Sequence, residues 1–64
     1  MTLAEYMKTA GETDATIADK VGRDRSSVTR WRLGRTKPDF DALVALERAS
    51  KGLITARDFV EQAA

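Results

Sequence analysis

The middle of the chain, residues 14–33, has the sequence DATIADKVGRDRSSVTRWRL. Its apolar residues recur at helical spacing on both sides of a short interruption, Gly-Arg-Asp at residues 22–24. Glycine suits the left-handed residue that follows a helix, and Asp24 can cap the next helix through its carboxylate. The pattern predicts two helices, 14–21 and 25–33, joined by a turn so tight that they must cross closely at a steep angle.

The inner sides of these two helices carry small and apolar side chains. Ala18 is small enough to let the helices approach each other. On the second helix, Val28 and Trp31 lie three residues apart and therefore share one face. We expect these two side chains to fill the space around the crossing together with Ile17 and Val21.

The opposite face of the second helix carries hydroxyls and arginines. Ser26, Thr29, Arg30 and Leu33 follow the spacing i, i+3, i+4, i+7, and Arg25 flanks this face at the helix start. Small side chains let a helix approach base edges in the major groove of DNA, and arginine can bond guanine O6 and N7 through two parallel hydrogen bonds. The face is typical of a helix that contacts bases.

The rest of the chain predicts three further helices, each bounded by a capping residue or a glycine. We expect them at residues 3–10, 40–50 and 56–63, with Leu53-Ile54-Thr55 as the one stretch that could form a short strand instead. The expected fold class is all-α, a compact bundle of about five short helices in a single domain over residues 1–64. Tyr6 and Phe40 are expected in the core.

Capping candidates precede all five predicted helices. Thr2 with Glu5 fits a capping box, in which hydroxyl and carboxylate each accept from the other residue's backbone N–H. Asp39 can cap the fourth helix as Asp24 caps the third. The remaining candidates are Thr13 or Asp14 for the second helix and Thr55 with Asp58 for the fifth.

Size and composition limit the classes of function. Sixty-four residues form one small domain. The chain has no cysteine and no histidine, which removes disulfides, thiolate metal sites and the commonest general base. We expect no enzyme activity, no cofactor and no metal, and Asp39 and Asp41 fit a helix start better than a metal site. With no secretion signal and no apolar run near the ~20 residues that span a bilayer, a cytoplasmic location is expected.

The formal net charge of +1 conceals a basic segment. Residues 23–37 contain six cations against the single anion Asp24, a net charge of +5, whereas residues 1–22 and 38–64 each carry −2. The cations coincide with the exposed side of a predicted helix and the loop after it. This distribution indicates a nucleic-acid-binding surface better than a solvated face.

Three motifs in order carry a resemblance to a known family. They are IADKVG at 17–22, DRSSVTRW at 24–31 and GRTKP at 34–38. This series resembles the phage Cro/repressor-type (Xre-like) helix-turn-helix family over about residues 13–50. Residues 47–59 are also similar to short Cro-like proteins and to antitoxin-like members of that group.

The resemblance implies a lambda-repressor-like DNA-binding domain whose recognition helix is 25–33. Many family members have a glutamine that binds a phosphate at the start of the preceding helix. The residue at that place in this chain is Asp14, whose negative charge a phosphate would repel. Arg32 leans towards the inner side of its helix and is a further candidate for a phosphate contact, whereas Arg23 could equally pair with an acid. The resemblance places bases opposite Arg25, Ser26, Thr29 and Arg30, the DNA backbone near Ser27, and phosphates against Arg35, Thr36 and Lys37.

These observations predict a sequence-specific regulator of transcription that binds double-stranded DNA, a Cro-like repressor that acts by operator occupancy. One small domain contacts one half-site, so we expect a homodimer, at least on DNA, with half-sites about one helical turn (~34 Å) apart. The expected dimer surface comprises Phe59 and Val60 with Leu53 and Ile54. The alternative is an antitoxin-like or adaptor protein whose main partner is another protein.

Overall fold

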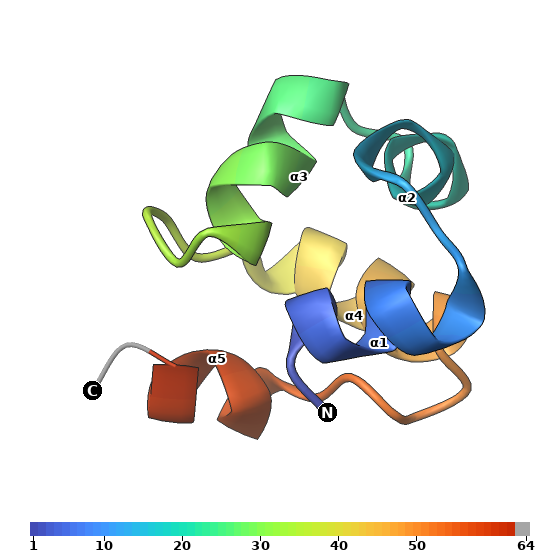
Figure 1. The fold of residues 1–64 in the computed structure, drawn as a ribbon. Coiled ribbons are helices and arrows are strands. Elements are labelled where there is room, and N and C mark those ends of the chain that lie inside the picture. Colours follow the sequence, from blue (N-terminus) through green and yellow to red (C-terminus); the bar gives the residue numbers. More distant parts are fainter. Residues whose placement is uncertain (63–64) are drawn as a thin grey trace.

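The structure, a computed structural model, describes residues 1–62, with side chains through residue 60. The described residues form an all-α bundle (Figure 1). Its helices are α1 (Leu3–Ala10), α2 (Asp14–Val21), α3 (Arg25–Arg32), α4 (Phe40–Ala49) and α5 (Ala56–Gln62). This confirms the predicted fold class and helix boundaries to within one residue, and residue 63, the expected end of the last helix, lies outside the described residues. The segment 53–55 is loop, not strand.

Local chemistry sets the ends of the helices. Thr2 and Glu5 form the capping box at the start of α1, and Thr13 caps α2. The backbone N–H of Ser27 donates to the Asp24 carboxylate at 3.2 Å, which caps α3. At the end of α2, Gly22 has a φ of 70°, a left-handed conformation that glycine adopts without strain. The turn of residues 22–24 can therefore join α2 to α3 within three residues.

The predicted cap of α4 by Asp39 is wrong. Its side chain makes no capping hydrogen bond. The carboxylate instead accepts two hydrogen bonds from the guanidinium of Arg23, at 2.6 and 2.9 Å. A charged, two-pronged partner is a stronger hydrogen-bond donor than the backbone N–H groups at a helix start, which explains the change.

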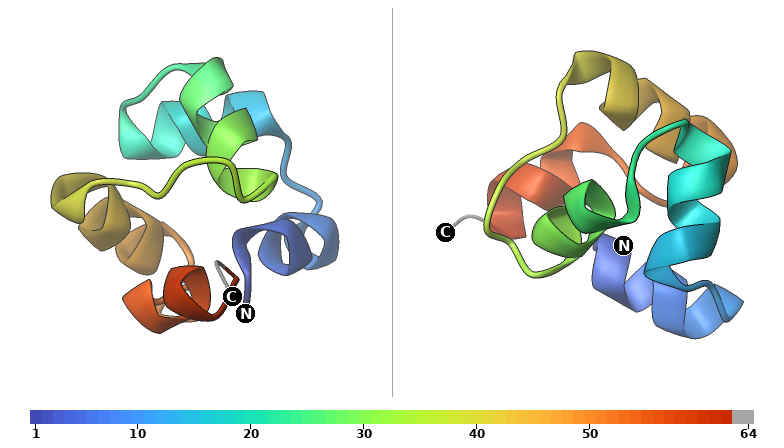
Figure 2. Two further views of the ribbon diagram at one scale, coloured as in Figure 1. Left: turned by 90° about the vertical axis from the view of Figure 1, so that its left-hand side faces the viewer. Right: turned by 90° about the horizontal axis from the view of Figure 1, so that it is seen from above.

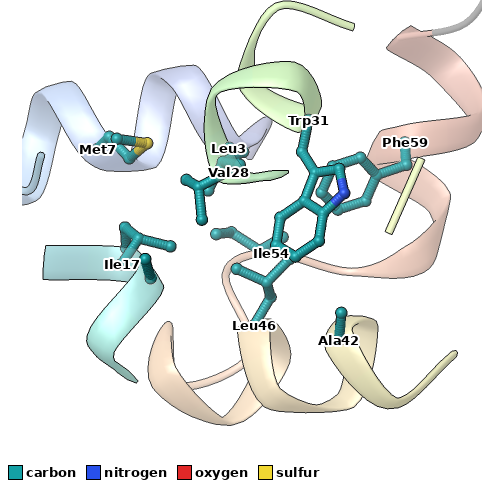
Figure 3. Close-up of a cluster of buried hydrophobic side chains, with 10 residues drawn as sticks. Leu3, Met7, Ile17, Val28, Trp31, Ala42, Leu46, Ile54 and Phe59 are labelled. Carbon is teal, nitrogen blue, oxygen red and sulfur yellow. The ribbon is translucent and has the colours of Figure 1, made fainter. Parts of the chain in front are cut away.

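The core lies where the five helices α1 to α5 and the loop before α5 converge (Figures 1 and 2). Figure 3 shows its side chains pointing towards a common centre, with Trp31 entering from α3. Only 4% of the Trp31 surface is exposed, and Val28 beside it is fully buried. The core also contains Leu3, Met7, Ile17, Ala18, Ala42, Leu46, Ile54 and Phe59.

Of the two aromatic side chains expected in the core, Phe40 is predicted wrongly, whereas Tyr6 packs against the core without being fully buried. Phe40 is 77% exposed because the buried stripe of α4 consists of Ala42 and Leu46, and a residue two positions before Ala42 lies about 200° around the helix. Tyr6 is half-buried, packs against the core and donates a hydrogen bond to the Ala49 carbonyl at 3.4 Å.

The expected dimer surface is also only partly available. Ile54 and Phe59 point into the core of their own chain and cannot serve a second copy. Leu53 and Val60 remain, with 51% and 64% of their surfaces exposed. Adjacent positions in a helix point in different directions, so Phe59 and Val60 could not both face a partner. Separately, the helices within residues 1–62 are too short and too polar to cross a lipid bilayer.

Replacing Trp31 tests the packing of α3. We expect Trp31→Ala to lower the free energy of unfolding by about 3–5 kcal/mol, because it empties the centre of a small core. Phe40→Ala is the matched control, since it truncates an exposed aromatic side chain and should change stability by no more than about 0.5 kcal/mol. Urea unfolding followed by circular dichroism measures both. Equal losses in the two variants would contradict the assignment of Trp31 to the core.

Candidate nucleic-acid interface

The helix α3 presents opposite faces to the core and to solvent. Val28 and Trp31 are buried, whereas Ser26, Arg30 and Leu33, the residue after the helix, are exposed. Figure 2 shows α3 next to α2, with the following loop passing along the side of the molecule to α4. This division of inner and outer residues agrees with the prediction except at Thr29, which is half-buried because its hydroxyl bonds to Asp14 of α2.

Asp14, at the start of α2, holds the last turns of α3. Its Oδ1 accepts a hydrogen bond from Arg32 Nε at 2.8 Å, and its Oδ2 accepts one from Arg32 Nη2 at 3.0 Å. Oδ2 also accepts from the hydroxyl of Thr29 at 2.7 Å. The guanidinium is the main reason why the pKa of Asp14 lies below its usual range. Arg32 therefore fastens α3 to α2, and the charge of Asp14, which would repel a phosphate, is offset.

Asp24 organises the hydroxyls at the start of α3. Its Oδ1 accepts from the Ser27 hydroxyl at 2.7 Å, and its Oδ2 accepts from the Ser26 hydroxyl as well as from the Ser27 backbone. These bonds, led by that of Ser26, hold the pKa of Asp24 far below its usual range. Arg30 in turn donates from Nη2 to the Ser27 hydroxyl at 3.3 Å. The first turn of α3 is thus a connected polar network around one ionised carboxylate.

The remaining predicted cations are exposed. The side chains of Arg25, Arg30, Arg35 and Lys37 form no ion pair with a described residue, unlike those of Arg23 and Arg32. The backbone N–H of Arg35 donates to the Arg30 carbonyl at 2.9 Å, so the basic loop starts against the end of α3. Thr36 lies in the same exposed loop, and Ser27 is half-buried. The structure brings these predicted residues onto α3 and the loop that continues it.

Two acidic residues were not predicted to shape this surface. Asp14 and Asp39 come from α2 and from the residue before α4, and each pairs with one cation of the basic segment. These pairs depend on how the helices cross, so spacing along the chain carried no signal for them, although an acidic partner for Arg23 was one of the open alternatives. Within the described residues, no three potential ligands among His, Cys, Asp and Glu cluster as a metal site would need.

Comparison with known proteins gives no further identification. No protein-family model, no curated protein and no solved structure matches this chain. The geometry and charge of the residues themselves are therefore what indicates a function.

The Asp14–Arg32 pair makes stability depend on pH in a defined direction. The pKa of Asp14 is lower in the folded state than in the unfolded state. Its contribution to the free energy of unfolding is therefore complete above the unfolded-state pKa of about 4, and is lost as the pH falls through the folded-state pKa. We expect the melting temperature to fall below pH ~4, and Asp14→Asn to make that decline shallower while lowering stability at pH 7. Asp19→Asn also removes a carboxylate but leaves Arg32 paired. This variant should therefore retain the part of the acid-induced decline that is due to Asp14. A decline unchanged in Asp14→Asn would contradict the role of the pair.

Proposed function

We propose that this protein is a sequence-specific DNA-binding regulator of transcription that inserts α3 into the major groove. One observation carries the proposal: α3 buries Val28 and Trp31 while its outer face and the following loop expose four cations without an acidic partner among the described residues. The cations are Arg25, Arg30, Arg35 and Lys37. A cationic helix face continued by a cationic loop suits both a groove and the phosphates that border it.

The contacts divide by chemistry. Arg35 and Lys37, in the exposed loop, would bind phosphates and set the position of the protein on the duplex. Arg25 and Arg30 on α3 would donate to guanine O6 and N7. Arg30 is held by the Ser27 hydroxyl, which limits the freedom its side chain would lose on binding. Binding of this kind supports repression by occupancy, in which the bound protein excludes polymerase or a competing regulator.

A second copy would extend the contact to a palindromic site. We propose a homodimer, at least on DNA, with half-sites about one helical turn apart. The exposed apolar side chains of Leu53 and Val60 are the part of the expected dimer surface that remains available. A protein partner in place of DNA, as for an antitoxin-like or adaptor protein, is the competing hypothesis.

Selection of binding sites from a pool of random duplexes tests this function. The proposal predicts enrichment of one motif, arranged as two inverted half-sites with centres about one helical turn apart. A pool that stays random after repeated rounds would refute sequence-specific binding and favour the protein-partner hypothesis.

Arg30→Ala tests base contact. We expect the affinity for the selected duplex to fall by about 1–3 kcal/mol and the preference at one base pair to be lost, because a two-pronged contact to guanine disappears. Arg48→Ala removes the same charge from α4, outside the proposed surface, and should change neither quantity. Fluorescence anisotropy with single-base variants of the duplex measures both. An unchanged set of preferences in Arg30→Ala would rule out its role in specificity.

Lys37→Ala tests phosphate contact. It should weaken binding to selected and random duplexes by a similar factor, and reduce the slope of log affinity against log salt by about one, because one phosphate contact releases about one counterion. Titrations at several salt concentrations give the slope, with Arg48→Ala again as control. A loss confined to the selected duplex would assign Lys37 to a base instead.

A further inference from the structure

The hydroxyl of Ser26 has its only proton directed at a carboxylate. Ser26 Oγ donates to Asp24 Oδ2, and the same oxygen accepts the backbone N–H of Ser27. An ionised carboxylate can accept but not donate, so the proton of this bond must come from the serine. Ser26 is an exposed residue, and what its hydroxyl offers to a ligand is therefore lone pairs.

The hydroxyl proton of Thr29, about one turn further along α3, is also used in a hydrogen bond within the protein. Its Oγ1 lies 2.7 Å from Asp14 Oδ2 and 3.1 Å from the carbonyl oxygen of Arg25. Both neighbours are acceptors, so the single hydroxyl proton is used within the protein whichever of them receives it. The side of α3 away from the core thus combines arginines, which can only donate, with the exposed hydroxyl of Ser26 and the half-buried hydroxyl of Thr29, which can only accept.

The edges of bases differ in whether they donate or accept a hydrogen bond. In the major groove, the donors are the exocyclic amino groups, N6 of adenine and N4 of cytosine, whereas guanine O6, thymine O4 and purine N7 accept. Phosphate oxygens also accept only. We propose that Ser26 and Thr29 contact exocyclic amino groups of bases, and that Asp24 is the positioning residue that keeps Ser26 an acceptor; this inference rests on the proposed function. A keto oxygen opposite either hydroxyl would leave two acceptors facing each other.

The first arm of the test locates the base pair that Ser26 contacts. This is the position of the selected duplex whose base preference disappears in Ser26→Ala. At that pair, one modified duplex lacks the exocyclic amino group, with purine for adenine or 2-pyrimidinone for cytosine, and a second lacks the keto oxygen of the opposite base. Loss of the amino group should weaken binding of the unmodified protein about fivefold to tenfold and leave Ser26→Ala unaffected. Loss of the keto oxygen should affect both proteins equally.

The second arm replaces Asp24. Asp24→Ser retains a good helix cap but removes the carboxylate, which frees the Ser26 hydroxyl to donate outwards. Asp24→Asn is the matched control, because it removes the same charge. The amide oxygen of that variant must face the Ser27 N–H and so still accepts from Ser26. We expect the amino-group effect to fall to about twofold or less in Asp24→Ser and to persist in Asp24→Asn.

Each outcome has a definite meaning. The proposal is supported if the affinity loss on removal of the amino group requires Ser26, persists in Asp24→Asn and disappears in Asp24→Ser. Coupling to the keto oxygen, no preference lost in Ser26→Ala, or equal behaviour of the two Asp24 variants would overturn it while leaving sequence-specific binding intact. Failure of the unmodified protein to enrich any duplex would instead overturn the proposed function and this inference with it.

Discussion

The crossing of α2 and α3 is the constraint on which the rest of the structure depends. Ala18 and Ile17 lie in the core with Val28 and Trp31, and at the rim Asp14 bonds to the side chains of Thr29 and Arg32. A helix of eight residues has little stability in isolation, so its orientation has to come from such contacts. Apolar packing below and an ion pair at the rim together fix which residues of α3 face outwards.

Acidic residues divide the cations of the basic segment, residues 23–37, into a set that is paired with described carboxylates and a set that is not. The cations of Arg23 and Arg32 are paired with carboxylates and join elements of the fold, whereas those of Arg25, Arg35 and Lys37 project without an acidic partner among the described residues. Asp24 also accepts the proton of the Ser26 hydroxyl, and the Thr29 proton is donated either to Asp14 or to the Arg25 carbonyl. If the surface binds DNA as proposed, unpaired carboxylates would oppose binding, and the hydrogen bonds of Asp14 and Asp24 determine what the surface offers to a base.

The sequence was sufficient for the helices and for the two faces of α3, because caps, glycines and helical spacing act locally. It was not sufficient where tertiary contacts compete with local preference. The Asp39 carboxylate bonds to Arg23 instead of capping α4. Arg23 lies sixteen residues away and is brought near only by folding. Phe40 was assigned to the core on hydrophobicity alone, although Ala42 and Leu46 define the buried side of its helix. The site residues on α3 could be proposed in advance, but the pairing of Arg32 could not.

The central claim is that the outer face of α3 and the loop after it form the surface that contacts DNA. A titration of the isotopically labelled protein with a short duplex, followed by amide chemical shifts, tests it most directly. The account predicts the largest shifts at residues 24–37, with Leu53 and its neighbours altered only when the duplex carries two half-sites. Shifts centred on α1 or on the middle of α4, or none at a duplex excess, would contradict it.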